Sequence, residues 1–202
     1  MPETNPTRLQ IIQRARELFF ERGFSKVTTD EVAASLGISK KTLYQHFESK
    51  EDLVRAAVHA LRDEIAGGIE RIVDDRDLDF AEKLKGVMTI LGAKVSQLRR
   101  PFFEDIRKKA PDLWRELEEF RRERILTVFE RLITQGSRKG MLRKGVDPHL
   151  FVMMFYAVIQ QVFNPDVLSQ LPLTPAEAFR TFITVMMEGV LTDEARKKLE
   201  GE

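Results

Sequence analysis

The chain has 202 residues and carries 33 Lys or Arg against 32 Asp or Glu, so its formal net charge is +1 and any case for a nucleic-acid partner must be made from local charge. It contains no cysteine, which excludes disulfides and thiolate metal sites and fits a reducing cytoplasm. Neither a signal-peptide pattern nor an apolar run of about 18 residues occurs, so we expect a cytoplasmic protein without membrane-spanning segments.

The N-terminal segment predicts three helices and the beginning of a fourth. Residues 7–22 carry apolar side chains at helical spacing and are followed by Gly23, which is typical of a helix C-terminus. Thr28 and Ser49 each precede an acidic residue by three positions, a pattern that caps helix N-termini. Between them, residues 40–47 form a run of about eight residues, which is too short to be stable as an isolated helix.

The rest of the chain also has helical periodicity, with no convincing strand pattern. We expect Gly67–Gly68 to kink or end the fourth helix, and the acidic segment 74–79 to be a solvated linker. Further helices are predicted over 80–98, between Pro101 and Pro111, over 112–136, and after the caps Asp147 and Thr174. The sequence thus predicts an all-α fold of about nine to ten helices, divided into residues 1–52 and 53–202.

Residues 28–47 have the spacing of a helix-turn-helix. Ala33 supplies the small side chain that two steeply crossing helices need, and Gly37 tolerates positive φ in the turn. Apolar residues hold the pair against the first helix, namely Val32, Leu36, Ile38, Leu43 and Phe47. A polar flank remains outside, and it can reach phosphates and base edges from a major groove. It comprises Lys40, Lys41, Thr42, Tyr44, Gln45 and His46. Spacing alone leaves open a short amphipathic helix with a merely solvated face.

This segment resembles the DNA-binding signature of the tetracycline-repressor (TetR) family of bacterial transcriptional regulators. The matching stretches are "ARELFFERGF", "TTDEVA" and "GISKKTLYQHFESKEDL", in that order. The resemblance implies an N-terminal three-helix helix-turn-helix DNA-binding domain and a C-terminal helical ligand-binding and dimerisation domain. By matched position it implies DNA contacts from Thr28, Thr29, Lys40, Thr42, Tyr44, His46 and Lys50. Lys41 and Gln45 are then base-reading or phosphate positions particular to this chain.

The resemblance also implies a homodimer on a pseudo-palindromic operator in double-stranded DNA. A rigid dimer must space its recognition helices by roughly 34–36 Å or a multiple of that distance. The last two long helices have apolar faces wider than one packing seam needs, so they are candidates for a four-helix dimer interface. The candidate residues are Phe151, Phe155, Ile159, Val162, Phe179, Phe182, Ile183, Met186 and Val190. Packing within one chain is the alternative for all of them.

The resemblance further implies a small-molecule effector whose binding releases a repressor from DNA. Aromatic and methionine side chains in the second block can surround an apolar or aromatic molecule. The candidates are Phe102, Phe103, Trp114, Phe129, Met153, Met154, Tyr156, Gln160 and Phe163. Core packing explains each of them individually as well.

Two other classes of function compete with this interpretation. The chain has no nucleophile elbow, no P-loop, no dinucleotide fingerprint and only three scattered histidines, so we predict neither an enzyme nor a cofactor or metal site. The alternative is a helical dimeric module whose helix-turn-helix docks on a protein partner. Binding to duplex DNA that weakens steeply with salt distinguishes the two, because phosphate contacts release counterions. Repression is the default within the family, and the sequence does not distinguish a repressor from an activator.

Overall fold

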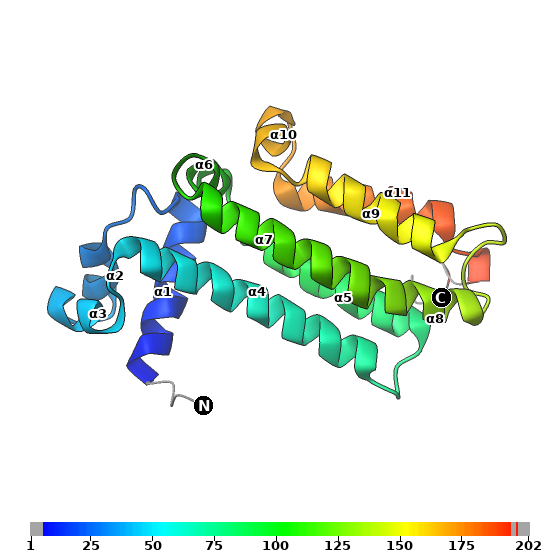
Figure 1. The fold of residues 1–202 in the computed structure, drawn as a ribbon, viewed down its shortest axis with the longest axis horizontal. Coiled ribbons are helices and arrows are strands. Elements are labelled where there is room, and N and C mark those ends of the chain that lie inside the picture. Colours follow the sequence, from blue (N-terminus) through cyan, green and yellow to red (C-terminus); the bar gives the residue numbers. More distant parts are fainter. Residues whose placement is uncertain (1–5, 195–196, 198–202) are drawn as a thin grey trace. The chain divides into compact units, whose positions relative to one another are not determined.

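The computed structural model describes residues 6–194 and residue 197. In chain order the helices are α1 (Pro6–Arg22), α2 (Thr29–Ser35), α3 (Lys40–His46), α4 (Lys50–Asp74), α5 (Phe80–Val95), α6 (Arg100–Lys109), α7 (Pro111–Arg124), the π-helical η1 (Ile125–Phe129), α8 (Glu130–Arg138), α9 (Pro148–Val162), α10 (Pro165–Gln170) and α11 (Pro175–Val190) (Figure 1). The prediction of an all-helical fold is confirmed. None of the described helices is both long and apolar enough to cross a membrane.

The chain divides into two compact units. The first unit combines Met1–Glu64 with Gln97–Trp114, and the second combines Ile65–Ser96 with Arg115–Glu202. Side-chain caps explain several of the helix starts: the side chains of Thr28, Asp79, Asp147 and Thr174 each accept a backbone N–H in the first turn. The three caps predicted among these, Thr28, Asp147 and Thr174, are confirmed.

In the first unit, α2 packs against both α1 and α3. Ala33 is buried at this contact, and Gly37 has a φ of +67° in the turn that follows, as the spacing predicted. The capping box at α2 is complete, because the Glu31 carboxylate accepts the Thr28 backbone N–H at 2.8 Å. That N–H and the Arg22 guanidinium lower the pKa of Glu31 from its ordinary value. The start of α2 is therefore fixed by local chemistry.

Helix α6 belongs to the same unit and packs against α1. The Arg99 backbone N–H donates to the Phe20 carbonyl at 3.0 Å, and the Ser25 backbone N–H donates to the Asp105 carboxylate at 2.7 Å. The rings of Phe20 and Phe102 lie 4.6 Å apart between centroids. These contacts fix the turn that joins α1 to α2.

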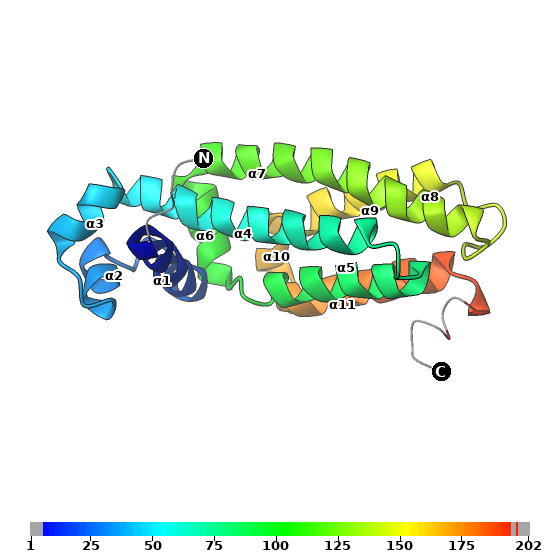
Figure 2. The same cartoon turned by 90° about the horizontal axis from the view of Figure 1, so that it is seen from below.

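In the second unit, α11 packs on α5, and α9 packs on α8 and η1 (Figure 2). The core between them contains the fully buried Leu84, Leu132, Ile133 and Phe155. The end of α4 is tied to this core, because the buried Lys83 ammonium donates to the Val73 carbonyl at 2.8 Å. Its cation also opposes the partial negative charge at the C-terminus of α4.

Two local predictions need correction, and one helix was not predicted. The spacing of Thr7 and Gln10 predicts a capping box, but helix α1 already includes Pro6, so Thr7 lies inside the helix rather than capping it. Helix α4 continues through Gly67–Gly68 to Asp74. A Cβ at Gly68 would lie 3.0 Å from Ile90 Cδ1, so this glycine allows close packing against α5 and does not end the helix. The short helix α10 was not predicted, since six residues are too few to show a helical period.

Candidate functional site

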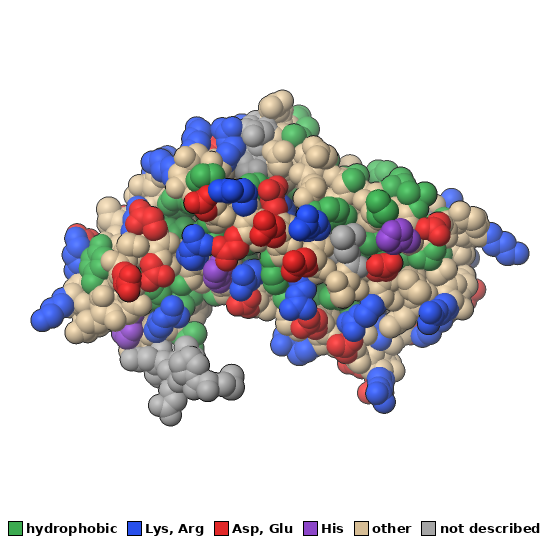
Figure 3. All heavy atoms as spheres, viewed as in Figure 1, with side chains coloured by type: hydrophobic (Ala, Val, Ile, Leu, Met, Phe, Trp, Pro, Cys, Tyr) green, Lys and Arg blue, Asp and Glu red, His purple; other side chains and the backbone are tan. Residues whose placement is uncertain are grey.

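The polar flank of α3 lies on the surface of the first unit. Leu43 and Phe47 are 0% and 1% exposed, and they turn the opposite face of the helix inward. Lys40, Lys41, Tyr44 and Gln45 are exposed, as is Thr28, whereas Thr42, His46 and Lys50 are half-buried. Figure 3 shows Lys and Arg side chains projecting from the surface where α2 and α3 lie. The arrangement leaves donors and an aromatic hydroxyl available to a partner outside the chain.

Thr29 is the one member of the predicted set that is buried, at 7% exposure. Its hydroxyl lies 3.3 Å from the Tyr44 hydroxyl, so the two side chains share a hydrogen bond. Tyr44 itself is 42% exposed. Thr29 therefore fixes the position of the Tyr44 hydroxyl. Thr29 could contact a partner directly only if its buried hydroxyl became exposed.

Lys40 forms an ion pair with Asp30 of α2, with 2.9 Å between Nζ and Oδ1. The Asp30 carboxylate raises the pKa of Lys40 through a hydrogen bond and its charge. Both side chains are more than half exposed, so water and salt screen the pair and its net stabilisation is small. An anion outside the chain must displace the Asp30 carboxylate before it can pair with Lys40. The sequence did not predict this ion pair.

The beginnings of two helices add backbone donors beside these side chains. The Ser39 hydroxyl caps α3 by accepting the Thr42 N–H, and the Ser49 hydroxyl caps α4 by accepting the Asp52 N–H, each at 3.0 Å. Lys50 is the first residue of α4, as predicted. A cation beside the positive end of a helix dipole favours an anion such as a phosphate.

The predicted effector-pocket residues are divided between the two units. Phe102, Phe103 and Trp114 belong to the first unit, and the remaining six belong to the second. Within the second unit, Phe129 and Phe163 are core residues, Tyr156 and Gln160 are half-buried, and Met153 and Met154 are 50% and 52% exposed. The two methionines therefore face solvent in the single chain instead of an enclosed space.

The second unit also contains buried polar groups on Tyr156, which is one of the predicted pocket residues, and on Arg121, which the sequence did not distinguish. The Tyr156 hydroxyl is buried without a hydrogen-bond partner among the described residues, and burial raises the pKa of Tyr156. Burial likewise lowers the pKa of Arg121, against the opposing charge of Glu118. The surface charge pattern of residues 112–124 resembles that of any solvated helix, so no sequence signal singles out Arg121.

Several predicted interface residues pack inside the single chain. Phe151, Phe155, Ile159 and Phe179 are at most 7% exposed, and the Phe129 and Phe155 ring centroids lie 4.3 Å apart. Val162, Phe182, Ile183 and Met186 are half-buried, and the side chain of Val190 lies outside the described residues.

Other apolar side chains face outward on the same two helices. Leu150, Met153 and Met154 on α9 are 56%, 50% and 52% exposed, and Val185 on α11 is 65% exposed. Residues 150, 153 and 154 follow helical spacing and share one face of α9. Figure 3 shows hydrophobic side chains gathered on the surface where α9 lies. We call these four residues the outer stripe.

The chain is similar to known proteins both in its N-terminal segment and over most of its length. The signature of "Bacterial regulatory proteins, tetR family" matches residues 11–57. The chain is 29% identical over 185 residues to the Bacillus subtilis protein named "Uncharacterized HTH-type transcriptional regulator YvaF", which covers 92% of this chain and 96% of that one. It is 22% identical to the Bacillus subtilis "Fatty acid metabolism regulator protein", over 94% and 98% of the two chains.

A solved structure with the same fold is SmeT, the repressor of the Stenotrophomonas maltophilia multidrug efflux pump SmeDEF. The TM-score is 0.65 at 20% identity, over 96% of this chain and 93% of that one. SmeT has also been solved in complex with triclosan, with a TM-score of 0.66 at 19% identity, over 95% and 94% of the two chains.

Proposed function

The chain belongs to the TetR family of helix-turn-helix transcriptional regulators, which is not a family of enzymes, and from this premise we propose a specific role. The protein is a cytoplasmic repressor that binds a pseudo-palindromic operator as a homodimer. A small apolar or aromatic molecule releases it from DNA. Residues 1–52 form the DNA-binding domain, and residues 53–202 form the effector and dimerisation domain.

The observation that carries this proposal is the orientation of α3. Its apolar residues are buried in the first unit, and Lys40, Lys41, Tyr44 and Gln45 are exposed together. A B-DNA major groove is wide enough to admit a helix, and lysine and glutamine are common partners of guanine and adenine edges there. The exposed side chains of this seven-residue helix are not those that would stabilise a short helix by themselves.

Each proposed DNA contact has a distinct part. Lys41 and Gln45 read base edges, and Tyr44, placed by Thr29, donates its hydroxyl to a phosphate. Thr28, Thr42, His46 and Lys50 contact the backbone together with the first-turn N–H groups of α2 and α4. Lys40 contributes once it exchanges Asp30 for a phosphate.

We propose that dimerisation uses the outer stripe. Its support is that Leu150, Met153, Met154 and Val185 leave apolar surface in water, which a second copy would remove. The predicted residues Phe155 and Phe179 then support the interface from beneath. Light scattering of Met154→Asp should give the mass of one chain where the unchanged protein gives that of two, with the same helical circular dichroism.

Two observations support release by an apolar or aromatic effector: the aromatic core of the second unit and the names of similar proteins. Phe129, Phe155 and Phe163 form a core rich in aromatic side chains beside the half-buried Tyr156 and Gln160. SmeT has been solved with triclosan, and a relative is named for fatty acid metabolism. Both names fit an effector with a large apolar part.

A mobility-shift titration tests the proposal. The full chain is titrated on duplex DNA taken from beside its own gene and on a shuffled duplex, between about 50 and 200 mM salt. Preference for the natural duplex with affinity that falls steeply as salt rises is the expected result. Binding that is absent at low salt, or insensitive to salt, would favour the protein-docking module instead. Repeating the titration with triclosan asks whether an aromatic molecule weakens the complex.

A further inference from the structure

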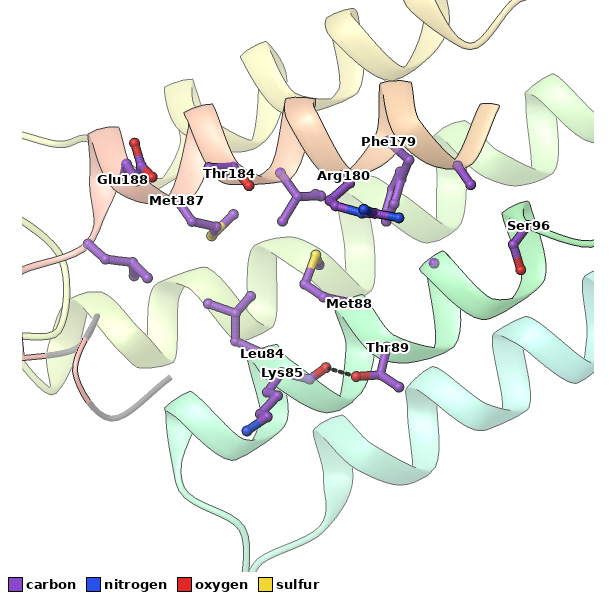
Figure 4. Close-up of a pocket in the computed structure, with 14 residues that line it drawn as sticks. Leu84, Lys85, Met88, Thr89, Ser96, Phe179, Arg180, Thr184, Met187 and Glu188 are labelled. Carbon is purple, nitrogen blue, oxygen red and sulfur yellow. Dashed lines mark hydrogen bonds between the residues drawn. The ribbon is translucent and has the colours of Figure 1, made fainter. Parts of the chain in front are cut away.

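The sequence did not predict the groove that lies between α5 and α11 of the second unit. Its volume is about 480 Å³, which is within the size range of small-molecule sites. Figure 4 shows Leu84 and Met88 of α5 facing Phe179 and Met187 of α11 across it. Water in such a groove has few hydrogen-bond partners along these side chains, so an apolar body displaces it favourably.

The groove is also lined by two cationic side chains and by the neutral hydroxyls of Thr89, Ser96 and Thr184. Lys85 on α5 and Arg180 on α11 line the groove, are exposed, and form no ion pair within the described part of the chain. Thr89 also lines it, but its hydroxyl proton is donated to the Lys85 carbonyl at 2.8 Å, so it offers only acceptor lone pairs. Lys85 and Arg180 are therefore the strongest hydrogen-bond donors of the groove, and they favour a ligand that carries an acceptor group.

Two carboxylates on α11 could cancel this charge. The Glu177 carboxylate feels the charge of Arg180, but it accepts the Thr174 backbone N–H at 2.7 Å as part of the helix cap. Glu188 lines the groove eight residues after Arg180, which is about 12 Å farther along a helix. Figure 4 shows Glu188 and Arg180 at separate places along α11, with Phe179 beside Arg180. The stretch around Arg180 is thus both apolar and cationic.

We propose that this groove binds an amphipathic monoanion of the straight-chain fatty-acid class. The carboxylate lies at Arg180, whose guanidinium can donate two parallel hydrogen bonds to it. The alkyl chain lies over Leu84, Met88 and Met187, and methionine side chains adapt to chains of different length. This inference rests on the proposed function, because it gives the apolar effector a chemical class and a site; it is tested without DNA, so its failure would leave the proposal of operator binding untouched.

Calorimetric titration of the full DNA-free chain with decanoate, decanol and decylamine tests this. Decanoate should bind more tightly than either of the others. Arg180→Gln should weaken decanoate by at least about tenfold, because it removes a charge-assisted contact. Arg138→Gln is the matched control, an exposed arginine of the same unit at the end of α8, and it should change binding by less than about twofold. Equal binding of decanol, or an unchanged affinity in Arg180→Gln, would overturn the proposal.

A second variant tests the groove without relying on charge. A Cβ at Gly92 meets only Phe179 Cε1, at 4.0 Å, so a longer side chain extends into the groove. Gly92→Leu also improves helix propensity in α5, so loss of decanoate binding would not reflect unfolding. The expected result is loss of binding with an unchanged mass in light scattering. Retained binding, or a changed oligomeric mass that identifies the groove as an interface between copies, would contradict the assignment.

Discussion

The turns before and after α2 offer a matched pair of substitutions, Gly23 between α1 and α2 and Gly37 between α2 and α3. Gly23 and Gly37 both have positive φ, at +79° and +67°, where alanine costs about 1–2 kcal/mol through its Cβ. A Cβ at Gly23 would also lie 2.6 Å from Asp105 Oδ2 and 3.1 Å from the Pro101 carbonyl oxygen, whereas at Gly37 it meets nothing within 4 Å. Only Gly23→Ala therefore forces a neighbour to move.

The added cost at Gly23 follows from what Asp105 does. Its carboxylate accepts the Ser25 backbone N–H at 2.7 Å, and displacing it loses a charged hydrogen bond worth about 1.5–3 kcal/mol. Because this bond lies at the surface, we take the lower part of that range. We expect Gly23→Ala to destabilise the chain by about 2–4 kcal/mol and Gly37→Ala by about 1–2 kcal/mol.

Urea unfolding followed by circular dichroism measures both values, and the comparison is valid while the denaturant slope is unchanged. In an Asp105→Ala background the difference between the two glycine substitutions should shrink, because the displaced carboxylate is gone. Equal costs for Gly23→Ala and Gly37→Ala in the unchanged background would refute the view that α6 fixes this turn.

Four further changes have defined outcomes. Tyr44→Ala should abolish preference for the operator in a mobility shift while mass and helicity stay unchanged, and normal binding would show that α3 is oriented differently. Lys50→Ala should weaken all duplexes and reduce the salt slope by about one unit; a loss confined to one sequence would contradict a phosphate contact. Asp30→Asn should tighten DNA binding by up to about fivefold in fluorescence anisotropy, because Lys40 loses its competitor, and weaker binding would argue against that competition. Lys83→Met should cost about 1–3 kcal/mol in urea unfolding, because the buried Val73 carbonyl loses its donor; an unchanged midpoint would show that the carbonyl finds another.

The sequence predicted those parts of the fold that depend on neighbouring residues. Caps such as Thr28 and Asp147 and the positive φ of Gly37 are set within a few positions of the chain, so their pattern can be recognised directly. The inward face of α3 was predictable for the same reason, since Leu43 and Phe47 share one side of a single helical turn.

Features that depend on distant segments were missed. The Lys40–Asp30 pair joins two helices, and the Lys83–Val73 contact depends on how α5 meets the end of α4. Two faces of α9 are apolar, so periodicity could not tell the core face of Phe155 from the outward face of Met154. The groove beside Arg180 requires α5 and α11 to lie together, which no local pattern encodes.

The central claim is that the outer flank of α3 enters a major groove. Because the chain has no cysteine, Gln45→Cys introduces a single thiol on that flank, and Lys139→Cys introduces one at an exposed site in the second unit. Each variant is incubated with operator duplex that carries, on a base in the major groove, a tether ending in a mixed disulfide with a small thiol, so that the protein thiolate can displace that thiol. We expect a disulfide cross-link for Gln45→Cys and none for Lys139→Cys. Operator binding without a cross-link at residue 45, or equal cross-linking at both residues, would contradict it.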